Sequence, residues 1–383
     1  MGSLPEVALV TYSTKPRGGV VHTLSLAEAL LRQGFGVRVV ALGDPGTGFF
    51  RDTGVPHTIV PAPPRLDTLE DRVFAAIDTL EAWLRDAGER YDIVHTQDCI
   101  AATAAARVRD AGAAFTVIRT VHHVDDFRTE ALIDCQRRAI VEPDRLVVVS
   151  EHWRSSLQAE FGVDPVVIHN GVDPARFAPI PAAERQAFRE RAGANGRFVL
   201  LSVGGVEPRK GSVYLFEAMA RLKGDAVLVV VGGESFQDYA AYREEAYGAL
   251  PGLGLELGRD IMVLGTIDDA DIRRWYRSAD ALAFPSTKEG FGLAVLEAVC
   301  ADLPVVASDL PVFREYLVHE RNALLAPVGD SAALAAELRR VIDDAALRDR
   351  LRTNARELIG RFSWDAAATR HRELYARTRA AAL

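Results

Sequence analysis

Short, almost solidly apolar segments alternate along the chain with longer segments in which apolar residues recur every three or four positions. The first kind is typical of strands buried on both faces of a parallel sheet, and the second of amphipathic helices. The expected strands are residues 7–11, 37–42, 92–96, 115–121, 146–150, 166–169, 198–203, 226–231, 261–264, 281–284 and 305–307. The expected helices are residues 23–33, 69–87, 101–111, 212–222, 270–278 and 293–301.

The alternation is interrupted once, over residues 173–195. This segment carries Pro174, Pro179 and Pro181 and then a polar, helix-like stretch. The pattern therefore predicts two successive Rossmann-like, doubly wound α/β domains, 1–173 and 174–363. Residues 364–383 are expected to form a terminal helix that crosses back to the first domain.

Composition narrows the class of protein. The 383 residues are 49% hydrophobic and 26% charged, which is ordinary for a globular protein. A net charge of −8 argues against a nucleic-acid surface or a polybasic membrane anchor. The three cysteines, Cys99, Cys135 and Cys300, are far apart and odd in number, so we expect reduced thiols.

The sequence indicates a cytoplasmic protein. The first residues lack a charged segment followed by a long apolar one, and no apolar run reaches 18 residues, so neither a signal peptide nor a transmembrane span is expected. A peripheral membrane contact would need an exposed basic amphipathic face, which the pattern does not indicate.

The turn between the strand at 198–203 and the next helix has the features of an anion site. Gly204 and Gly205 let the backbone approach a ligand, and Arg209 and Lys210 add two cations before a helix N-terminus. A diphosphate is the natural ligand. The alternative is an ordinary turn with two solvated cations. The turn matches neither the dinucleotide-binding nor the Walker A pattern.

A similar turn follows the first strand. Lys15 and Arg17 precede Gly18 and Gly19, and a helix follows. This turn either faces an anion or a substrate or is a plain strand–helix connection, and the residues alone leave both open.

Two glutamates bracket a loop and the start of a helix. Glu289 follows the strand at 281–284, at the edge of the sheet where ligands of such folds bind, and Glu297 lies about 7.5 Å along the helix from Gly292. Both carboxylates can reach different parts of one ligand. The N–H groups of Phe291, Gly292 and Leu293 would point toward that ligand. The alternatives are that Glu289 is a solvated loop acid and that Glu297 pairs with a surface cation.

Three further groups of polar residues are candidates for a functional role. Asp269-Ala-Asp271 is formally a metal-binding D-x-D pattern, but it precedes a helix and is expected to supply an N-cap and a first-turn acid. His122 and His123 follow a strand, where a histidine is catalytic or structural. Asp98 lies in the loop after His95, and its default role is an exposed loop acid.

The stretch Glu-Gly-Phe-Gly-Leu-Ala-Val-Leu-Glu at 289–297 resembles the E-x7-E signature of retaining glycosyltransferases of the GT-B fold, especially family 4. The turn Arg209-Lys210-Gly211 is similar to the donor-phosphate turn of that family. Further similar stretches are residues 18–19, 92–95, 120–122, 149–151, 170–173 and 362–364. The resemblance covers essentially the whole chain.

The resemblance implies two Rossmann-like domains facing a cleft, an acceptor side at 1–173 and a nucleotide-sugar side at 174–363. Arg209 and Lys210 would bind the donor diphosphate, and Glu297 the ribose. Glu289 and His122 would act at the reacting sugar, with Asp98 a candidate acceptor contact. The other implied donor contacts are Gly19, Gly205, Ile267, Gly290, Phe291, Gly292 and Leu293. The substrates would be a UDP- or GDP-linked sugar and an unidentified acceptor, with no metal or other cofactor.

One departure from the family pattern bears on activity. The family commonly has an arginine where this chain has Gly205, so one diphosphate-binding cation is missing. A retaining glycosyltransferase is the main hypothesis. A sugar-nucleotide epimerase on the same fold and a catalytically weakened nucleotide-sugar-binding protein are the alternatives.

Overall fold

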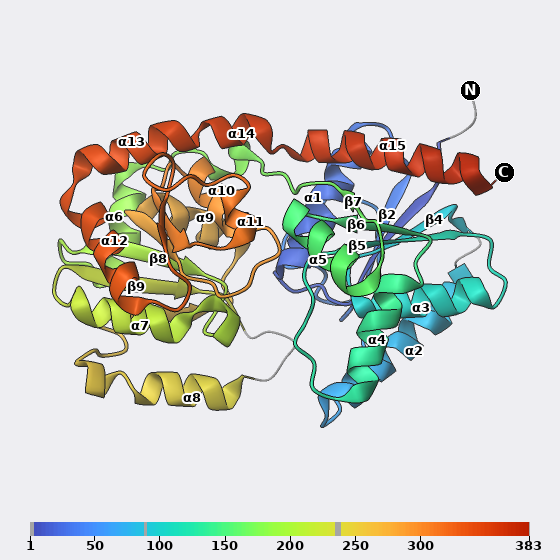
Figure 1. Cartoon of the computed structure of the whole chain (residues 1–383), viewed down its shortest axis with the longest axis horizontal. Helices are drawn as coiled ribbons and strands as arrows, with labels where there is room; N and C mark the ends of the chain where they lie inside the picture. Colours follow the sequence, from blue (N-terminus) through green and yellow to red (C-terminus); the bar gives the residue numbers. More distant parts are fainter. Residues whose placement is uncertain (1–3, 88–89, 234–238, 383) are drawn as a thin grey trace. The chain divides into compact units, whose positions relative to one another are not determined.

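The computed structural model describes residues 4–87, 90–233 and 239–382, and the chain divides into two compact units. Unit 1 comprises residues 1–171 and 364–383, and unit 2 comprises residues 172–363. Each unit is built on one parallel sheet covered by helices, shown in Figure 1. The predicted α/β class with two Rossmann-like sheets is confirmed.

The sheet of unit 1 has the strand order β3-β2-β1-β4-β5-β6-β7. Its strands are β1 (Val7–Thr11), β2 (Val37–Gly43), β3 (His57–Pro61), β4 (Ile93–Thr96), β5 (Thr116–Val121), β6 (Arg145–Val148) and β7 (Val166–Val167). Its helices are α1 (Gly18–Arg32), α2 (Leu69–Ala87), α3 (Cys99–Asp110), α4 (Glu130–Val141), α5 (Glu151–Phe161) and α15 (Trp364–Ala382). Helix α1 packs with α15, and α3 packs with both α2 and α4.

The sheet of unit 2 has the strand order β10-β9-β8-β11-β12-β13. Its strands are β8 (Phe198–Val203), β9 (Ala226–Val231), β10 (Ile261–Gly265), β11 (Ala281–Phe284), β12 (Val305–Ser308) and β13 (Leu324–Ala326). Its helices are η2 (Pro174–Phe177), α6 (Ala182–Arg191), η3 (Pro208–Lys210), α7 (Ser212–Arg221), α8 (Ala240–Gly248), η4 (Pro251–Leu253), α9 (Asp269–Ser278), α10 (Leu293–Cys300), α11 (Pro311–Arg314), α12 (Ser331–Asp343), α13 (Ala345–Ala355) and α14 (Glu357–Arg361).

Both sheets reverse their winding at the same topological place. The reversal lies between β1 and β4 in unit 1 and between β8 and β11 in unit 2. Ligands of doubly wound folds bind outside the carboxyl ends of the strands at this switch point. The loops that follow β1, β4, β8 and β11 are therefore where each unit can hold a ligand.

The structure differs from the sequence predictions in several elements. Strands β3 and β13 were not expected, and β6 ends at Val148, so Ser150 caps α5 instead of closing the strand. Helix α1 begins at Gly18 instead of residue 23. Gly18 and Gly19 thus form the first helical turn, where backbone N–H groups have no partner within the helix.

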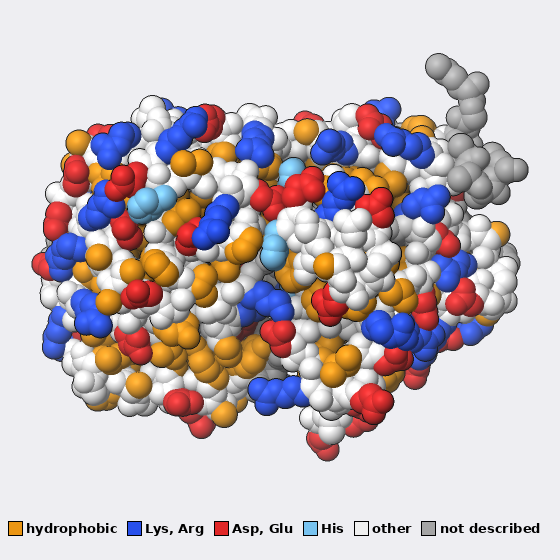
Figure 2. Space-filling view, viewed as in Figure 1, with side chains coloured by type: hydrophobic (Ala, Val, Ile, Leu, Met, Phe, Trp, Pro, Cys, Tyr) orange, Lys and Arg blue, Asp and Glu red, His pale blue; other side chains and the backbone are white. Residues whose placement is uncertain are grey.

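Acidic and basic side chains are interspersed over the face of each unit that Figure 2 shows. Among the helices that the structure describes, none combines the length and the apolar character needed to cross a membrane.

Candidate active site

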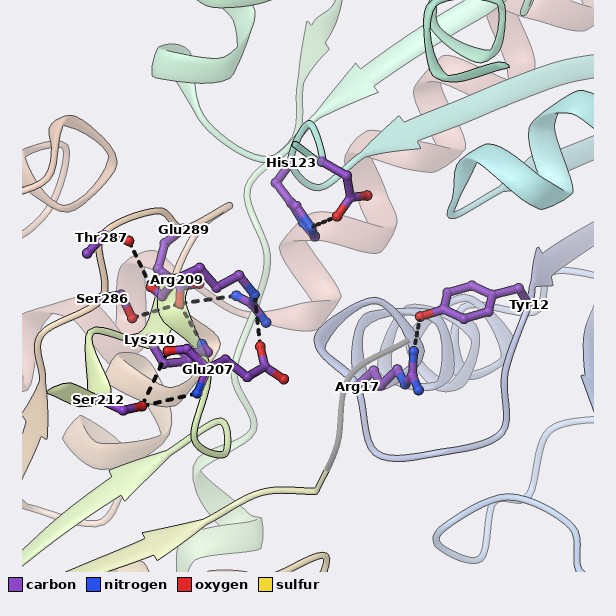
Figure 3. Close-up of polar contacts among 11 residues, drawn as sticks. Tyr12, Arg17, His123, Glu207, Arg209, Lys210, Ser212, Ser286, Thr287 and Glu289 are labelled. Carbon is purple, nitrogen blue, oxygen red and sulfur yellow. Dashed lines mark hydrogen bonds and ion pairs between the residues drawn. The ribbon is translucent and has the colours of Figure 1, made fainter. Parts of the chain in front are cut away.

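Lys210 is the buried cation of unit 2. It ends the short helix η3 after β8, and its side chain is 11% exposed. Its Nζ lies 4.7 Å from the centre of the Phe284 ring, a cation–π distance. The ammonium donates to Oε1 of Glu289 at 2.5 Å (Figure 3). Two loops that are 79 residues apart in the sequence thus meet in one ion pair.

Glu289 is the anion at the centre of this cluster. It lies between β11 and α10, and its side chain is 9% exposed. Ser286 Oγ donates to the same Oε1 atom at 3.0 Å, and Arg209 Nη1 lies 3.6 Å from it. Thr287 N donates to the carbonyl of Arg209 at 2.8 Å, which ties the β11 loop to η3. The arginine–lysine turn and Glu289, which the sequence presents as separate motifs, therefore lie in one cluster.

Burial and charge act against each other in this cluster. Burial lowers the pKa of Lys210, and the Glu289 carboxylate opposes that shift. Burial raises the pKa of Glu289, but Lys210 and Arg209 outweigh it and hold the net value below the usual range. The 2.5 Å distance between Lys210 Nζ and Glu289 Oε1 is that of an ion pair. A lysine ammonium has three N–H donors, so Lys210 can hold Glu289 and still bind an anionic ligand.

Gly204 and Gly205 both have a positive φ and little room for a side chain. Gly204 has φ +132°, and a Cβ there would overlap the Cε of Lys210. Gly205 has φ +76°, and a Cβ would come within 2.7 Å of the Gly233 carbonyl oxygen. The arginine that the family pattern has at position 205 does not fit this backbone, because the loop after β9 occupies the space.

Glu297 has a different partner from Glu289. It lies on α10, where Oε2 accepts from the hydroxyl of Tyr276 on α9 at 2.7 Å. Burial raises the pKa of Glu297, and the Tyr276 hydroxyl acts in the opposite direction. Burial and the Glu297 carboxylate together raise the pKa of Tyr276, which keeps its proton on the hydroxyl.

The start of α10 is fixed by its neighbours. Gly292 is the N-cap of α10, which begins at Leu293, and Gly290 lies in the loop before it. Phe291 is buried, and its carbonyl accepts from Tyr316 Oη at 2.6 Å. Ile267 lies in the loop between β10 and α9 and is half-buried.

The structure changes the expected N-cap residue of the D-x-D stretch. Asp268, not Asp269, is the N-cap of α9, and Asp269 and Asp271 are both acids of its first turn. Asp269 pairs with Arg176 and Arg273, and Asp271 with Arg191 and Arg274. Over the described ranges, no group of three or more His, Cys, Asp or Glu residues is placed to hold a metal ion.

His122 and Gly19 are brought together in unit 1. His122 follows β5, and a Cβ added at Gly19 would lie 3.6 Å from His122 Cδ2. His122 Nε2 is hydrogen-bonded to Gln97 Oε1 at 3.2 Å. Burial, with the neighbouring His123, lowers the pKa of His122 to about 3, so the ring is neutral at physiological pH. His123 is paired instead with Asp125 Oδ1 at 3.3 Å.

Three further histidines form a buried row behind His122. His22 lies edge-on to His122 with ring centres 4.7 Å apart, and His371 packs against both His22 and His95. His22 Nδ1 bonds to Asn170 Oδ1 at 2.7 Å, and His95 Nδ1 bonds to the hydroxyl of Tyr375 on α15 at 2.7 Å. Burial lowers the pKa of all three.

Asp98 is not the exposed loop acid expected by default. It is the N-cap of α3, where Oδ1 accepts from Ala101 N at 2.8 Å and Oδ2 from Tyr12 N at 2.9 Å. Burial raises its pKa to about 6. Tyr12 also accepts from Arg17 Nη1 at 2.5 Å, as Figure 3 shows.

Sequence reasoning missed Tyr276, His22, His371 and Tyr375. An aromatic or histidine residue within a helical pattern usually belongs to the core, so nothing in the local sequence distinguished them. Their roles follow from contacts with other segments, which no local pattern contains.

Comparison with known proteins agrees with this geometry. The family model of glycosyl transferases group 1 matches residues 184–358, and that of glycosyltransferase family 4 matches residues 16–176. A phosphatidyl-myo-inositol mannosyltransferase of Mycolicibacterium smegmatis is 30% identical over 375 residues, covering 95% of this chain and 91% of that protein. The chain belongs to the group 1 glycosyltransferases, family 4 type.

Solved structures confirm the GT-B architecture. Sucrose-phosphate synthase of Thermosynechococcus elongatus superimposes with a TM-score of 0.83 at 23% identity, covering 98% of this chain and all of that one. HepE of Anabaena, in complex with UDP and glucose, gives a TM-score of 0.80 at 21% identity, covering 97% of this chain and 99% of that one.

Proposed function

We propose that this glycosyltransferase moves a sugar from a nucleoside-diphosphate donor to an acceptor hydroxyl, with retention of configuration and without a metal ion. The observation that carries the proposal is the buried Lys210–Glu289 pair with Arg209 beside it, at the switch point of unit 2. The structure of HepE with UDP and glucose supports UDP as the first nucleotide to test.

The charges in unit 2 suit the leaving group. When the bond between the sugar and the diphosphate breaks, negative charge grows on the phosphate oxygens. Lys210, Arg209 and the N–H groups at the start of α10 are preorganised to stabilise that charge, which is the task of a metal ion in other transferases. Glu297 would bind the ribose hydroxyls, and the hydrogen bond from Tyr276 would hold its carboxylate in position for that contact.

Retention would follow from attack on the same face that the diphosphate leaves. The acceptor oxygen forms the new bond to the sugar carbon, the carbon–phosphate oxygen bond breaks, and the acceptor proton passes to the departing diphosphate. Glu289 would hold a donor-sugar hydroxyl. His122, being neutral, would hydrogen-bond to the sugar from unit 1. Gly19 would bring the first turn of α1 close to the phosphate, and Asp98 is proposed as an acceptor contact.

A weakened nucleotide-sugar-binding protein is the second candidate, and Gly205 is the observation that favours it. The missing arginine cannot be replaced at that position without moving the loop after β9. This candidate predicts donor binding without turnover.

The test is turnover of UDP-, GDP- and ADP-linked hexoses by the full-length protein in chelator, with products followed by NMR. Transfer or slow donor hydrolysis that releases the α-anomer from an α-linked donor is expected. A β-product would contradict retention, and activity that requires added metal would contradict metal independence. A 2-epimerised sugar formed without acceptor would identify an epimerase, and binding without any product would identify the binding protein.

A further inference from the structure

Arg119 is a buried cation that the proposed chemistry leaves without a role. It lies on β5, beside Thr96 of β4, and is 4% exposed. Its Nε and Nη1 atoms have no hydrogen-bond partner within the described residues. A guanidinium carries five N–H donors in a fixed plane, and burying a charge without hydrogen bonds is costly. The cost indicates that something outside the chain completes this group.

The nearby carboxylates do not accept hydrogen bonds from the unpaired Arg119 atoms. Asp98 is close enough to act on Arg119 electrostatically, but both of its oxygens accept from backbone N–H groups, of Ala101 and Tyr12. Asp125 is also within electrostatic range, and its Oδ1 is paired with His123. The two acids therefore offset the charge of Arg119, but neither accepts a hydrogen bond from its Nε or Nη1 atom.

The position of Arg119 is that of a ligand-binding residue. Tyr12 follows β1 and Asp98 follows β4, so the hydrogen bond between them spans the switch point of unit 1. β5 is the next strand in the sheet, and His122 directly follows it. Arg119 precedes His122 by three residues, near the carboxyl end of the same strand.

We propose that Arg119 binds an anionic group, a phosphate or a carboxylate, on the acceptor. The planar guanidinium matches either oxyanion with two parallel hydrogen bonds. The acceptor would then be an anionic hydroxyl compound, with its charged group held by Arg119 and its hydroxyl near His122. This inference rests on the proposed transferase function and adds the class of acceptor to it.

The experiment compares matched acceptors with the full-length protein. Glucose, glucose 6-phosphate and glucuronate, and myo-inositol with its monophosphate, differ in charge more than in hydroxyl chemistry. We expect kcat/KM to favour the anionic member of a pair, and Arg119→Met to reduce that preference by roughly 10- to 100-fold, the value of a charge-assisted hydrogen bond. Arg119→Lys should keep part of it. The phosphate and carboxylate arms identify which oxyanion is bound.

Arg51→Met is the matched control. Arg51 is a comparably buried arginine of the same unit, with a side chain 9% exposed, but its Nη1 and Nη2 both donate to Glu28, so only its Nε atom has no partner within the described residues. Its replacement should lower stability and leave the acceptor preference unchanged. Equal use of neutral and anionic acceptors, or an unchanged preference in Arg119→Met, would overturn the proposal.

A second readout does not depend on finding an acceptor. In a Lys210→Ala background, which removes the anion site of unit 2, inorganic phosphate or acetate should still raise the Tm. Adding Arg119→Met should abolish the rise for the oxyanion that Arg119 binds. If neither anion raises the Tm of the Lys210→Ala variant, the proposal is overturned. If the wild-type protein neither binds nor turns over a donor, the transferase function itself is contradicted.

Discussion

The two units share the strand order of a doubly wound fold but differ in the titratable groups that they bury near their switch points. Unit 2 buries an ion pair of Lys210 and Glu289, in which the carboxylate opposes the lowering of the Lys210 pKa by burial and the cations lower the pKa of Glu289. Unit 1 buries a row of histidines whose pKa values are lowered, so they stay neutral. The same type of fold thus holds an ion pair near the switch point of unit 2, and neutral histidines together with the buried Arg119 near that of unit 1.

The histidine row predicts the largest effect, a steep acid sensitivity of unit 1. His22, His95 and His371 are almost fully buried, and burial lowers the pKa of His371 to about 4 and those of the other two well below the usual range. Below pH 6.5 the unfolded chain binds protons that the folded chain does not, so stability falls as pH falls, until the folded-state pKa is reached. Three such groups give about 4 kcal/mol per pH unit.

Hydrogen exchange resolved by peptide, between pH 7 and pH 4.5, separates the two units. Peptides of unit 1 should lose protection first. His371→Phe removes one titrating group and should reduce the slope by about a third. Equal loss of protection in both units, or a slope unchanged by the substitution, would contradict the contrast between them.

Lys210→Met should destabilise unit 2 by about 3–5 kcal/mol, because it leaves the Glu289 carboxylate buried without its cation. The double variant Lys210→Met/Glu289→Gln should recover much of that loss. Lys223→Met, at an exposed lysine, removes the same charge and serves as the control. Thermal unfolding compares the wild type with these variants and with Glu289→Gln alone, and an additive double variant would mean that the pair is not coupled.

Tyr276→Phe should weaken UDP binding by about 1.5–3 kcal/mol, since Glu297 loses the donor that fixes its carboxylate. The substitution should matter less for 2′-deoxy-UDP, because part of the proposed ribose contact is already absent. Calorimetric titration gives both affinities. Equal losses for the two nucleotides would argue that Tyr276 supports the fold and does not act through Glu297.

Gly204→Ala should have the smallest effect, a loss of about 1 kcal/mol of stability from the positive φ, together with weaker UDP binding because the new methyl displaces Lys210. Gly224→Ala is the matched control, since φ is +92° there but the space is open. Chemical denaturation and UDP titration should show similar stability losses in both variants and a nucleotide effect only in the first. A nucleotide effect in both would mean that the lysine displacement is not its cause.

Much of the fold could be predicted because buried parallel strands are solidly apolar. Strand β3 escaped prediction because it lies in a proline-rich segment and has only one fully buried residue, Val60. Strand β13 is three residues long and is followed by Pro327. Helix α12 was not among the expected helices, although its sequence carries a local signal, with the cap Asp330 and apolar residues at 334, 338 and 341.

The candidate site was predictable only where a local motif carries it. Glu289, Glu297, Arg209 and Lys210 lie in recognisable motifs, but the ion pair between Lys210 and Glu289 was not among the expectations. The partners of these residues come from elsewhere in the chain. Tyr276 reaches Glu297 from another helix, and His371 reaches His22 from residues near the C-terminus. Such contacts depend on tertiary packing.

The most direct test of the proposed donor site is calorimetric titration of the full-length protein with UDP, GDP, ADP and NAD in chelator, beside Glu297→Ala. Binding of one nucleoside diphosphate without metal, weakened by the substitution, is the predicted result. Binding of NAD alone, or of no nucleotide, would contradict the assignment of unit 2 as the donor site.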